Sequence, residues 1–183
     1  MSRRIARPYA AALFGVLAKQ DPRALREVEA QLAAVGEVFR REPRLLRLFE
    51  VPAVPPARKR EVLQAVGQAL GLRREAQRLL AALAQHMRLR FLPDVVAAFR
   101  ELVDRREGVA RGTLTVPAAP DVAQLEAVGG ALSALTGSRV ELEAVVRPEM
   151  LAGFVVRMGS RVFDGSLRSR LNRFAAASQQ AGR

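Results

Sequence analysis

Apolar residues recur every three or four positions through the first half of the chain, which predicts a series of amphipathic helices. The clearest run follows Asp21-Pro22, which we expect to cap a helix extending to about Arg41. Its apolar stripe consists of Leu25, Val28, Leu32, Val35 and Phe39. Similar spacing predicts further helices over residues 5–18, 44–49, 57–70, 73–87 and from Leu92-Pro93 onward. Six helices with short links predict a helical bundle over residues 1–107.

The first predicted helix carries more apolar surface than one small bundle requires. At 100° per residue, its apolar side chains cover an arc of about 200°, whereas about 100° is enough to face a single core. One edge of this arc holds Ile5, Ala12 and Val16, and the other holds Ala10 and Phe14. Two interpretations remain open: neighbouring helices cover both edges, or one edge binds a helix of a partner protein.

The pattern changes after Glu107-Gly108, where alternation begins to replace helical spacing. Strands are expected over residues 109–116 and 139–146, separated by a helix that Asp121 caps. A hairpin and a final helix complete a β-α-β-β-β-α order over residues 108–183. The predicted fold class is therefore α+β, with an N-terminal six-helix bundle followed by a small α+β domain that contains a hairpin and two helices.

The predicted hairpin turns at Gly159-Ser160, a two-residue connection in which glycine supplies positive φ. It would place Val156 opposite Phe163 on an apolar face. Ser166 or Asp164 is expected to cap the final helix, whose apolar stripe consists of Leu167, Leu171 and Phe174. Nothing in this stretch is chemically reactive, which is typical of a docking unit.

The net charge of +12 is the main compositional feature, and only Lys19 and Lys59 among the thirty basic residues are lysines. Residues 1–107 hold 21 basic and 12 acidic residues, a balance of +9, and residues 108–183 hold 9 and 6, a balance of +3. Positive charge favours nucleic acid, anionic lipid or an acidic protein without choosing among them. No block of five consecutive basic residues occurs, so a solvated face is the simpler interpretation.

Candidate catalytic chemistry is sparse. The chain has no Cys and one His, His86, which excludes disulfides and multi-histidine metal sites. Phosphate-loop, dinucleotide-binding, zinc-protease and serine-hydrolase motifs are all missing. Asp164 has no second carboxylate or histidine at a spacing that would pair with it, so a role in the turn is the better account. We expect a chain that is not an enzyme, with no cofactor and no metal.

The N-terminus resembles a signal peptide only superficially. Arg3, Arg4 and Arg7 precede an apolar run, but no small-residue cleavage site follows and helical spacing continues through the run. The longest stretch without charge, Ala127 to Ser138, is shorter than the roughly 20 residues that span a bilayer. We therefore expect a soluble protein that keeps its N-terminus.

Three blocks of residues resemble one known family in order and spacing. The first is Ala6-Arg7-Pro8-Tyr9-Ala10 with Ala12-Leu13-Phe14, and the second is Arg88-Leu89 with Leu92-Pro93 and Phe99. The third, the most specific, comprises Leu151 to Gly153, Met158-Gly159, Asp164-Gly165-Ser166 and Arg170-Leu171. Together they are similar to the δ subunit of bacterial F-type ATP synthase, a relative of the mitochondrial oligomycin-sensitivity-conferring protein.

The chain departs from the family pattern at four places. His86-Met87 stands where the family has Asn-Gly, and Arg147, Ala152 and Ser160 stand where it has Asp, Gly and Asp. The first departure lies at a predicted helix end, so it affects how that end is capped. None of the four lies on a predicted apolar docking edge.

The resemblance implies a non-catalytic connector in the peripheral stalk of the F1Fo ATP synthase, which links the catalytic head to the b subunits so that the head resists rotary torque. One copy per complex would lie at the cytoplasmic face of the cell membrane, peripheral to it through the complex. Domain 1–107 would bind the N-terminal helix of an α subunit, and domain 108–183 would contact the b subunits. The alternative from the charge is an RNA-binding helical bundle of the antitermination-factor type, although the resemblance itself implies no nucleic acid.

The resemblance also assigns individual residues. Those expected to contact the α-subunit helix are Ile5, Tyr9, Ala12, Val16, Leu79, Ala82 and Leu83. The signature residues expected to shape the second domain are Gly153, Gly159, Asp164, Gly165, Ser166, Arg170 and Leu171. Gly153 is expected to mark a bulge or a close approach of two backbones.

Overall fold

The computed structural model describes residues 2–166, and the chain divides into two compact units, Met1–Val103 and Asp104–Arg183. The division falls inside a helix that ends at Glu107, slightly before the boundary at Gly108 expected from the sequence. The α+β class is confirmed, because helices fill the first unit and a mixed sheet forms the second.

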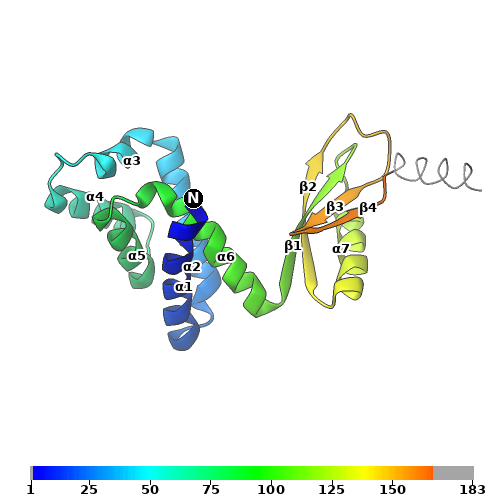
Figure 1. The fold of residues 1–183 in the computed structure, drawn as a ribbon, viewed down its shortest axis with the longest axis horizontal. Coiled ribbons are helices and arrows are strands. Elements are labelled where there is room, and N and C mark those ends of the chain that lie inside the picture. The colour runs from blue at the N-terminus through cyan, green and yellow to red at the C-terminus, as the bar shows by residue number, and fades with distance from the viewer. Residues whose placement is uncertain (1, 167–183) are drawn as a thin grey trace, which may run out of the picture. The chain divides into compact units, whose positions relative to one another are not determined.

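The first unit is built from helices of unequal length (Figure 1). They are α1 (Ser2–Gln20), α2 (Ala24–Arg41), α3 (Pro43–Glu50), α4 (Pro56–Ala69), α5 (Arg74–Gln85), the short 3-10 helix η1 (Leu89–Phe91) and α6 (Leu92–Glu107). Helices α1, α2 and α5 contact one another, and α4 packs on α5. Their apolar stripes meet in one core, in which Phe49, Phe99, Leu32 and Leu83 are completely buried. The rings of Phe14 and Phe99, and those of Phe39 and Phe49, make edge-to-face contacts in and against this core.

The start of α2 differs from the sequence prediction. Arg23, not Asp21, occupies the N-cap position, and Pro22 lies in the turn before the helix. The Asp21 carboxylate instead pairs with Arg73, 3.1 Å away at the start of α5. The Asp21 side chain, which local spacing assigned to the cap, therefore binds a charged residue that is distant in sequence.

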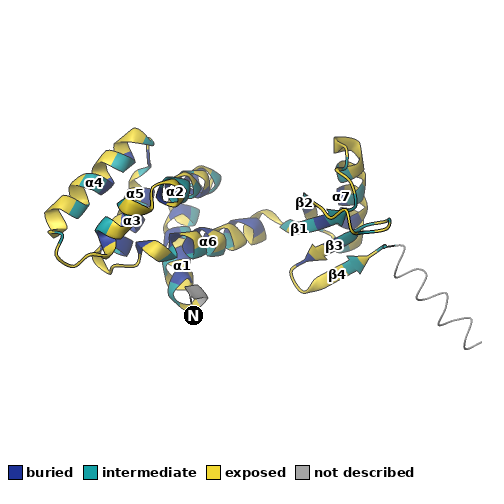
Figure 2. Cartoon of the chain, turned by 90° about the horizontal axis from the view of Figure 1, so that it is seen from above, coloured by how far each residue is buried: buried dark blue, intermediate teal, exposed yellow. Residues whose placement is uncertain are grey.

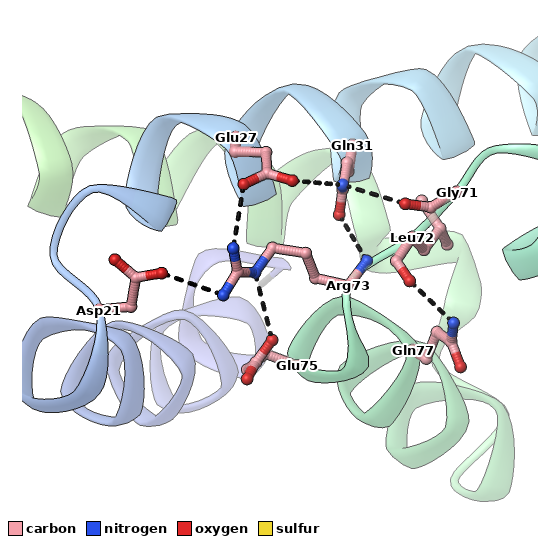
Figure 3. A network of polar contacts seen from close by, with 8 residues as sticks. All are labelled: Asp21, Glu27, Gln31, Gly71, Leu72, Arg73, Glu75 and Gln77. Carbon is pink, nitrogen blue, oxygen red and sulfur yellow. Dashed lines mark hydrogen bonds and ion pairs between the residues drawn. The ribbon is translucent and has the colours of Figure 1, made fainter.

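Arg73 is the centre of a polar network that anchors α5 (Figure 3). Its guanidinium contacts Asp21 and Glu27, each at 3.1 Å, and Glu75 at 3.6 Å. Its backbone N–H donates to the side-chain oxygen of Gln31 at 2.9 Å. The hydrogen bond with the Glu27 carboxylate raises the pKa of the Arg73 guanidinium above its ordinary value. The network joins the beginning of α5 to α2 and to the turn after α1.

The second unit contains a four-stranded mixed sheet in the order β2-β1-β3-β4 among the described residues. Its elements are β1 (Val109–Val116), α7 (Val122–Thr136), β2 (Arg139–Val146), β3 (Val155–Met158) and β4 (Arg161–Asp164). Strands β1 and β2 run parallel with α7 between them in the chain, whereas β3 is antiparallel to both β1 and β4. Val156 lies opposite Phe163 and Arg157 opposite Val162.

Helix α7 covers one face of this sheet (Figure 1). It begins with a capping box in which the Asp121 carboxylate accepts from the Gln124 N–H at 2.7 Å, and Gly137, whose φ is +68°, caps its C-terminal end. The Asp121 cap expected from the sequence is therefore confirmed. Leu132 of α7 packs with Leu114, Val140, Val156 and Met158 in the core of this unit.

Candidate docking surfaces

Helix α1 carries both buried and exposed residues (Figure 2). One of its exposed edges is apolar. On the core side Ala6 and Ala10 are completely buried and Leu17 nearly so, and the Phe14 ring lies 6.5 Å from that of Phe99. The edge that holds Ala10 and Phe14 is therefore covered by the unit itself. The edge that holds Ile5, Ala12 and Val16 is not.

The open edge forms a groove of about 520 Å³, which we call the α1 groove. Its lining residues are Arg4, Ile5, Pro8, Tyr9, Ala12 and Arg88. Ile5 and Tyr9 are half-buried, Ala12 is exposed, and Val16 follows along the same edge with 45% of its surface accessible. A continuous apolar strip of this kind on a helix suits a second helix laid alongside it.

Arg88 closes one side of the α1 groove, and the sequence did not single it out as a site residue. Its Nη1 donates to the Tyr9 hydroxyl at 3.0 Å, and its guanidinium carbon lies 5.9 Å from the centre of the Tyr9 ring. The turn after α5 positions it: the Arg88 N–H donates to the Leu83 carbonyl at 2.7 Å. Its place in the Arg88-Leu89 block was the available signal, but the contact with Tyr9 spans 79 residues.

The α5 residues assigned by resemblance lie mostly in the core. Leu83 is completely buried and Leu79 is 7% exposed, whereas Ala82 is half-buried. Helix α5 packs between α1, α2 and α4, which explains why its leucines face inward. Of the three, Ala82 therefore retains the most surface relative to its size, and the partner role of all three stays a prediction.

The signature residues of the second unit bring two backbone segments together. Gly153 has φ +93°, and a Cβ placed on it would lie 2.5 Å from the Gly165 carbonyl oxygen. The Gly165 N–H donates to the Phe154 carbonyl at 2.9 Å, and a Cβ on Gly165 would touch the Phe154 ring at 3.1 Å. Gly153 thus allows the close backbone approach expected of it, in the loop before β3.

The hairpin and the turn after it complete the signature region. Gly159 takes φ +57° at the hairpin turn. The Asp164 carboxylate accepts from the Ser166 N–H at 2.9 Å, which forms an Asx-type turn. Arg170 and Leu171, together with the predicted final helix, lie outside the described residues.

A second groove, of about 760 Å³, opens on the second unit. Its floor holds Thr113 and Thr115 of β1 with Val155 and Arg157 of β3, whose neighbours along each strand face the core under α7. The loop over residues 147–152 forms its wall, where Leu151 is 77% exposed. This groove therefore lies on the sheet face opposite α7.

Residues 2–166 offer neither a metal site nor a membrane-spanning helix. No group of three or more His, Asp or Glu side chains is placed to hold a metal ion in this part of the chain. None of the helices described there is both long and apolar enough to cross a membrane. His86 is exposed at the C-cap of α5.

Comparison with known proteins decides the family. Residues 5–177 match the family described as ATP synthase delta (OSCP) subunit. The chain belongs to this family. It is 34% identical over 174 residues to ATP synthase subunit delta of Nitrobacter winogradskyi, covering 95% of this chain and 92% of that protein. It is 36% identical over 166 residues to the same subunit of Oleidesulfovibrio alaskensis, covering 91% of each.

The fold also matches a solved assembly. A chain in the cryo-EM structure of the Toxoplasma gondii mitochondrial ATP synthase hexamer superposes with a TM-score of 0.69, covering 98% of this chain and 97% of that one. At 24% identity this match shows the shared fold. The resemblance inferred from the three sequence blocks is confirmed.

Membership in this family establishes the general role. The chain is a non-catalytic subunit of the F1Fo ATP synthase that acts as a connector in its peripheral stalk, and it works with other subunits of that complex. The RNA-binding alternative suggested by the charge is not favoured.

Proposed function

We propose that the α1 groove is the surface by which this connector holds the catalytic head, and that its occupant is the amphipathic N-terminal helix of an α subunit. The second domain, residues 108–183, contacts the C-terminal parts of the peripheral-stalk b subunits. In this account residues 1–107 act as a six-helix docking bundle, and one copy per complex lies at the cytoplasmic face of the cell membrane.

The observation that carries the proposal is the open apolar edge of α1. Ala6, Ala10 and Leu17 already anchor the helix in the core, so Ile5, Ala12 and Val16 contribute little further to the fold. Contiguous exposed apolar surface is a feature of interaction sites. A helix laid over it would gain about 25 cal/mol for each Å² of apolar surface removed from water.

The role in the stalk requires contacts that dissociate slowly, because torque from the rotating shaft acts on the head in every cycle. Buried apolar contacts at the centre of an interface contribute most of the affinity and therefore of the residence time. A small residue such as Ala12 at the middle of the groove lets the two helix backbones approach closely, and Tyr9 adds a large, half-buried aromatic surface beside it.

The groove on the open sheet face supports the assignment of the second domain. It is the larger of the two grooves described above, and Leu151 and Val145 at its border are exposed. A stalk segment that placed apolar side chains there would cover the sheet face that α7 leaves open.

Substituting Ala12 by Asp tests the α1 groove. Because Ala12 is exposed, the substitution should leave the fold intact, but it would strand a carboxylate in an apolar contact. We expect the affinity for a synthetic peptide of the α-subunit N-terminus to fall by more than about tenfold, measured by fluorescence anisotropy. Deleting residues 1–20 would be a poorer test, since it also removes core side chains.

Ala30→Asp is the matched control. Ala30 is exposed within α2 and does not line the α1 groove, so the same chemical change there should leave the affinity unchanged. Circular dichroism on both variants checks the fold. An Ala12→Asp chain that is folded and binds the peptide like the unmodified chain would show that this edge faces something else.

A further inference from the structure

Two arginines border the α1 groove, one on each side of its apolar floor. Residues four apart lie on one face of a helix, so Pro8 and Ala12 form the floor beside Ile5. At 100° per residue, Arg4 projects about 80° to one side of Ala12, so it lies at one margin of this strip. Tyr9 lies at the other margin and holds Arg88 against its ring and hydroxyl. The groove is therefore apolar along its middle and cationic on both sides.

Among the residues that the structure describes, no negative charge in the groove balances these arginines. Helix α1 contains no Asp or Glu, and none of the described residues that line the groove carries a carboxylate. Within the described residues, Arg40, Arg73 and Arg100 of the same unit each form an ion pair, whereas neither Arg4 nor Arg88 pairs with a carboxylate. A guanidinium has five N–H donors, and the bond to Tyr9 uses one of those of Arg88.

We propose that the helix docked in the α1 groove carries carboxylate side chains along both margins of its apolar stripe, one pairing with Arg4 and the other with Arg88. This inference rests on the proposed docking of a partner helix in this groove. Charge complementarity of this kind fixes the rotation of the docked helix about its own axis, because an unpaired arginine facing an apolar side chain would be desolvated without compensation.

Of the two arginines, Arg88 is the more favourably positioned to bind a carboxylate. Its contact with Tyr9 already restricts the side chain, so less conformational freedom is lost when a carboxylate binds. A planar guanidinium also accepts a carboxylate in a two-point geometry. We therefore expect the carboxylate that faces Arg88 to matter more than the one that faces Arg4.

The test uses the full chain and a fluorescent synthetic peptide of about 20 residues, long enough to form a helix, from the N-terminus of the α subunit of the same organism. A second peptide replaces each Asp by Asn and each Glu by Gln. Both are titrated by fluorescence anisotropy against the unmodified chain, Arg4→Glu, Arg88→Glu and the control Arg60→Glu. Arg60 is exposed on α4 and has no part in the groove, so it reproduces the change in net charge alone.

We expect Arg4→Glu and Arg88→Glu each to weaken binding of the acidic peptide by roughly fivefold or more at low salt, since attraction is replaced by repulsion. Arg60→Glu should change it by less than about twofold, through long-range charge only. The amide peptide should bind the unmodified chain more weakly than the acidic one, and added salt should reduce this difference.

Four results would overturn the inference. If both peptides bind equally, the proposed docking would stand, but the docked helix would need no carboxylates at its margins. The same conclusion would follow if Arg4→Glu and Arg88→Glu behave like Arg60→Glu. If the unmodified chain binds neither peptide at any salt concentration, the docking surface itself is wrong and this inference falls with it. If a single-stranded RNA displaces the acidic peptide and loses affinity in Arg4→Glu and Arg88→Glu, these arginines bind phosphates.

Discussion

At the scale of single residues, the turn after α5 holds one non-glycine residue in an unfavourable backbone conformation. Met87 has φ +53° and is the only non-glycine residue with positive φ in the described part of the chain. Its N–H donates to the Ala84 carbonyl at 3.0 Å, and the Arg88 N–H donates to the Leu83 carbonyl at 2.7 Å, which together form a Schellman motif. Glycine is the usual residue at this position.

We expect Met87→Gly to stabilise the chain. A left-handed conformation costs a non-glycine residue about 1–2 kcal/mol, part of which is offset by the greater freedom of glycine in the unfolded chain. Met87 is 49% exposed, so little packing is lost. The expected gain is roughly 0.5–1 kcal/mol in the free energy of unfolding, measured by urea denaturation.

Ala81→Gly provides the matched control for this prediction. Ala81 is exposed on α5, in ordinary helical conformation, so glycine there should destabilise the chain by about 1 kcal/mol. Opposite signs for the two substitutions would support the explanation. A loss of stability in both would mean that Met87 contributes contacts worth more than the strain.

Gly153 makes a complementary prediction in the second unit. Its positive φ and the 2.5 Å distance between an added Cβ and the Gly165 carbonyl oxygen leave no room for a side chain. We expect Gly153→Asp to destabilise this unit by roughly 2 kcal/mol or more, seen as faster hydrogen exchange in β3 and β1. Gly130→Ala should have the opposite effect, because Gly130 lies in α7 with nothing within 4 Å of an added Cβ. Unchanged exchange in Gly153→Asp would contradict the close approach.

At the scale of secondary-structure elements, Arg73 is the main polar tie between α5 and its neighbours (Figure 3). We expect Arg73→Gln to lower the urea midpoint of unfolding, since Asp21 and Glu27 would lose a shared partner. Arg58→Gln is the control, because Arg58 pairs with Glu61 within α4 and both side chains are largely exposed. A midpoint that shifts no more in Arg73→Gln than in Arg58→Gln would show that the network adds little.

The same elements show which features could be predicted from the sequence. The Asp121 cap of α7 was predictable because its partner, Gln124, is three residues away. The start of α2 was not, because the Asp21 carboxylate pairs with Arg73, a partner 52 residues distant that local spacing does not reveal. Local pattern thus predicts interactions within one element and fails where a distant charge competes for the same side chain.

The candidate site likewise contains features that the sequence predicted and features that it did not. Helical periodicity predicted that α1 is more apolar than its own core requires and identified two apolar edges, without deciding whether either is exposed. Only the folded chain shows that the edge with Ile5, Ala12 and Val16 is the open one. Arg88 was missed because only the folded chain brings it to Tyr9. Leu79 and Leu83 were assigned by resemblance, and their burial depends on how α5 packs, which periodicity does not specify.

At the scale of the whole molecule, a connector must bind two partners through separate surfaces. The α1 groove belongs to the first compact unit and the groove on the open sheet face to the second. The excess of positive charge is concentrated in residues 1–107, which suits an acidic binding partner there. Each unit has its own hydrophobic core, so the surface of one can be altered by substitution without changing the packing of the other.

The most direct test of the central claim uses the absence of cysteine from this chain. A single thiol introduced by Ala12→Cys lies in the α1 groove, and one introduced by Arg60→Cys lies outside it. Each variant is treated with a maleimide, alone and after co-purification with the catalytic head of the ATP synthase. We predict that the head strongly slows labelling at position 12 and leaves labelling at position 60 unchanged. Equal labelling rates at position 12 in the free chain and in the complex would contradict docking through this groove.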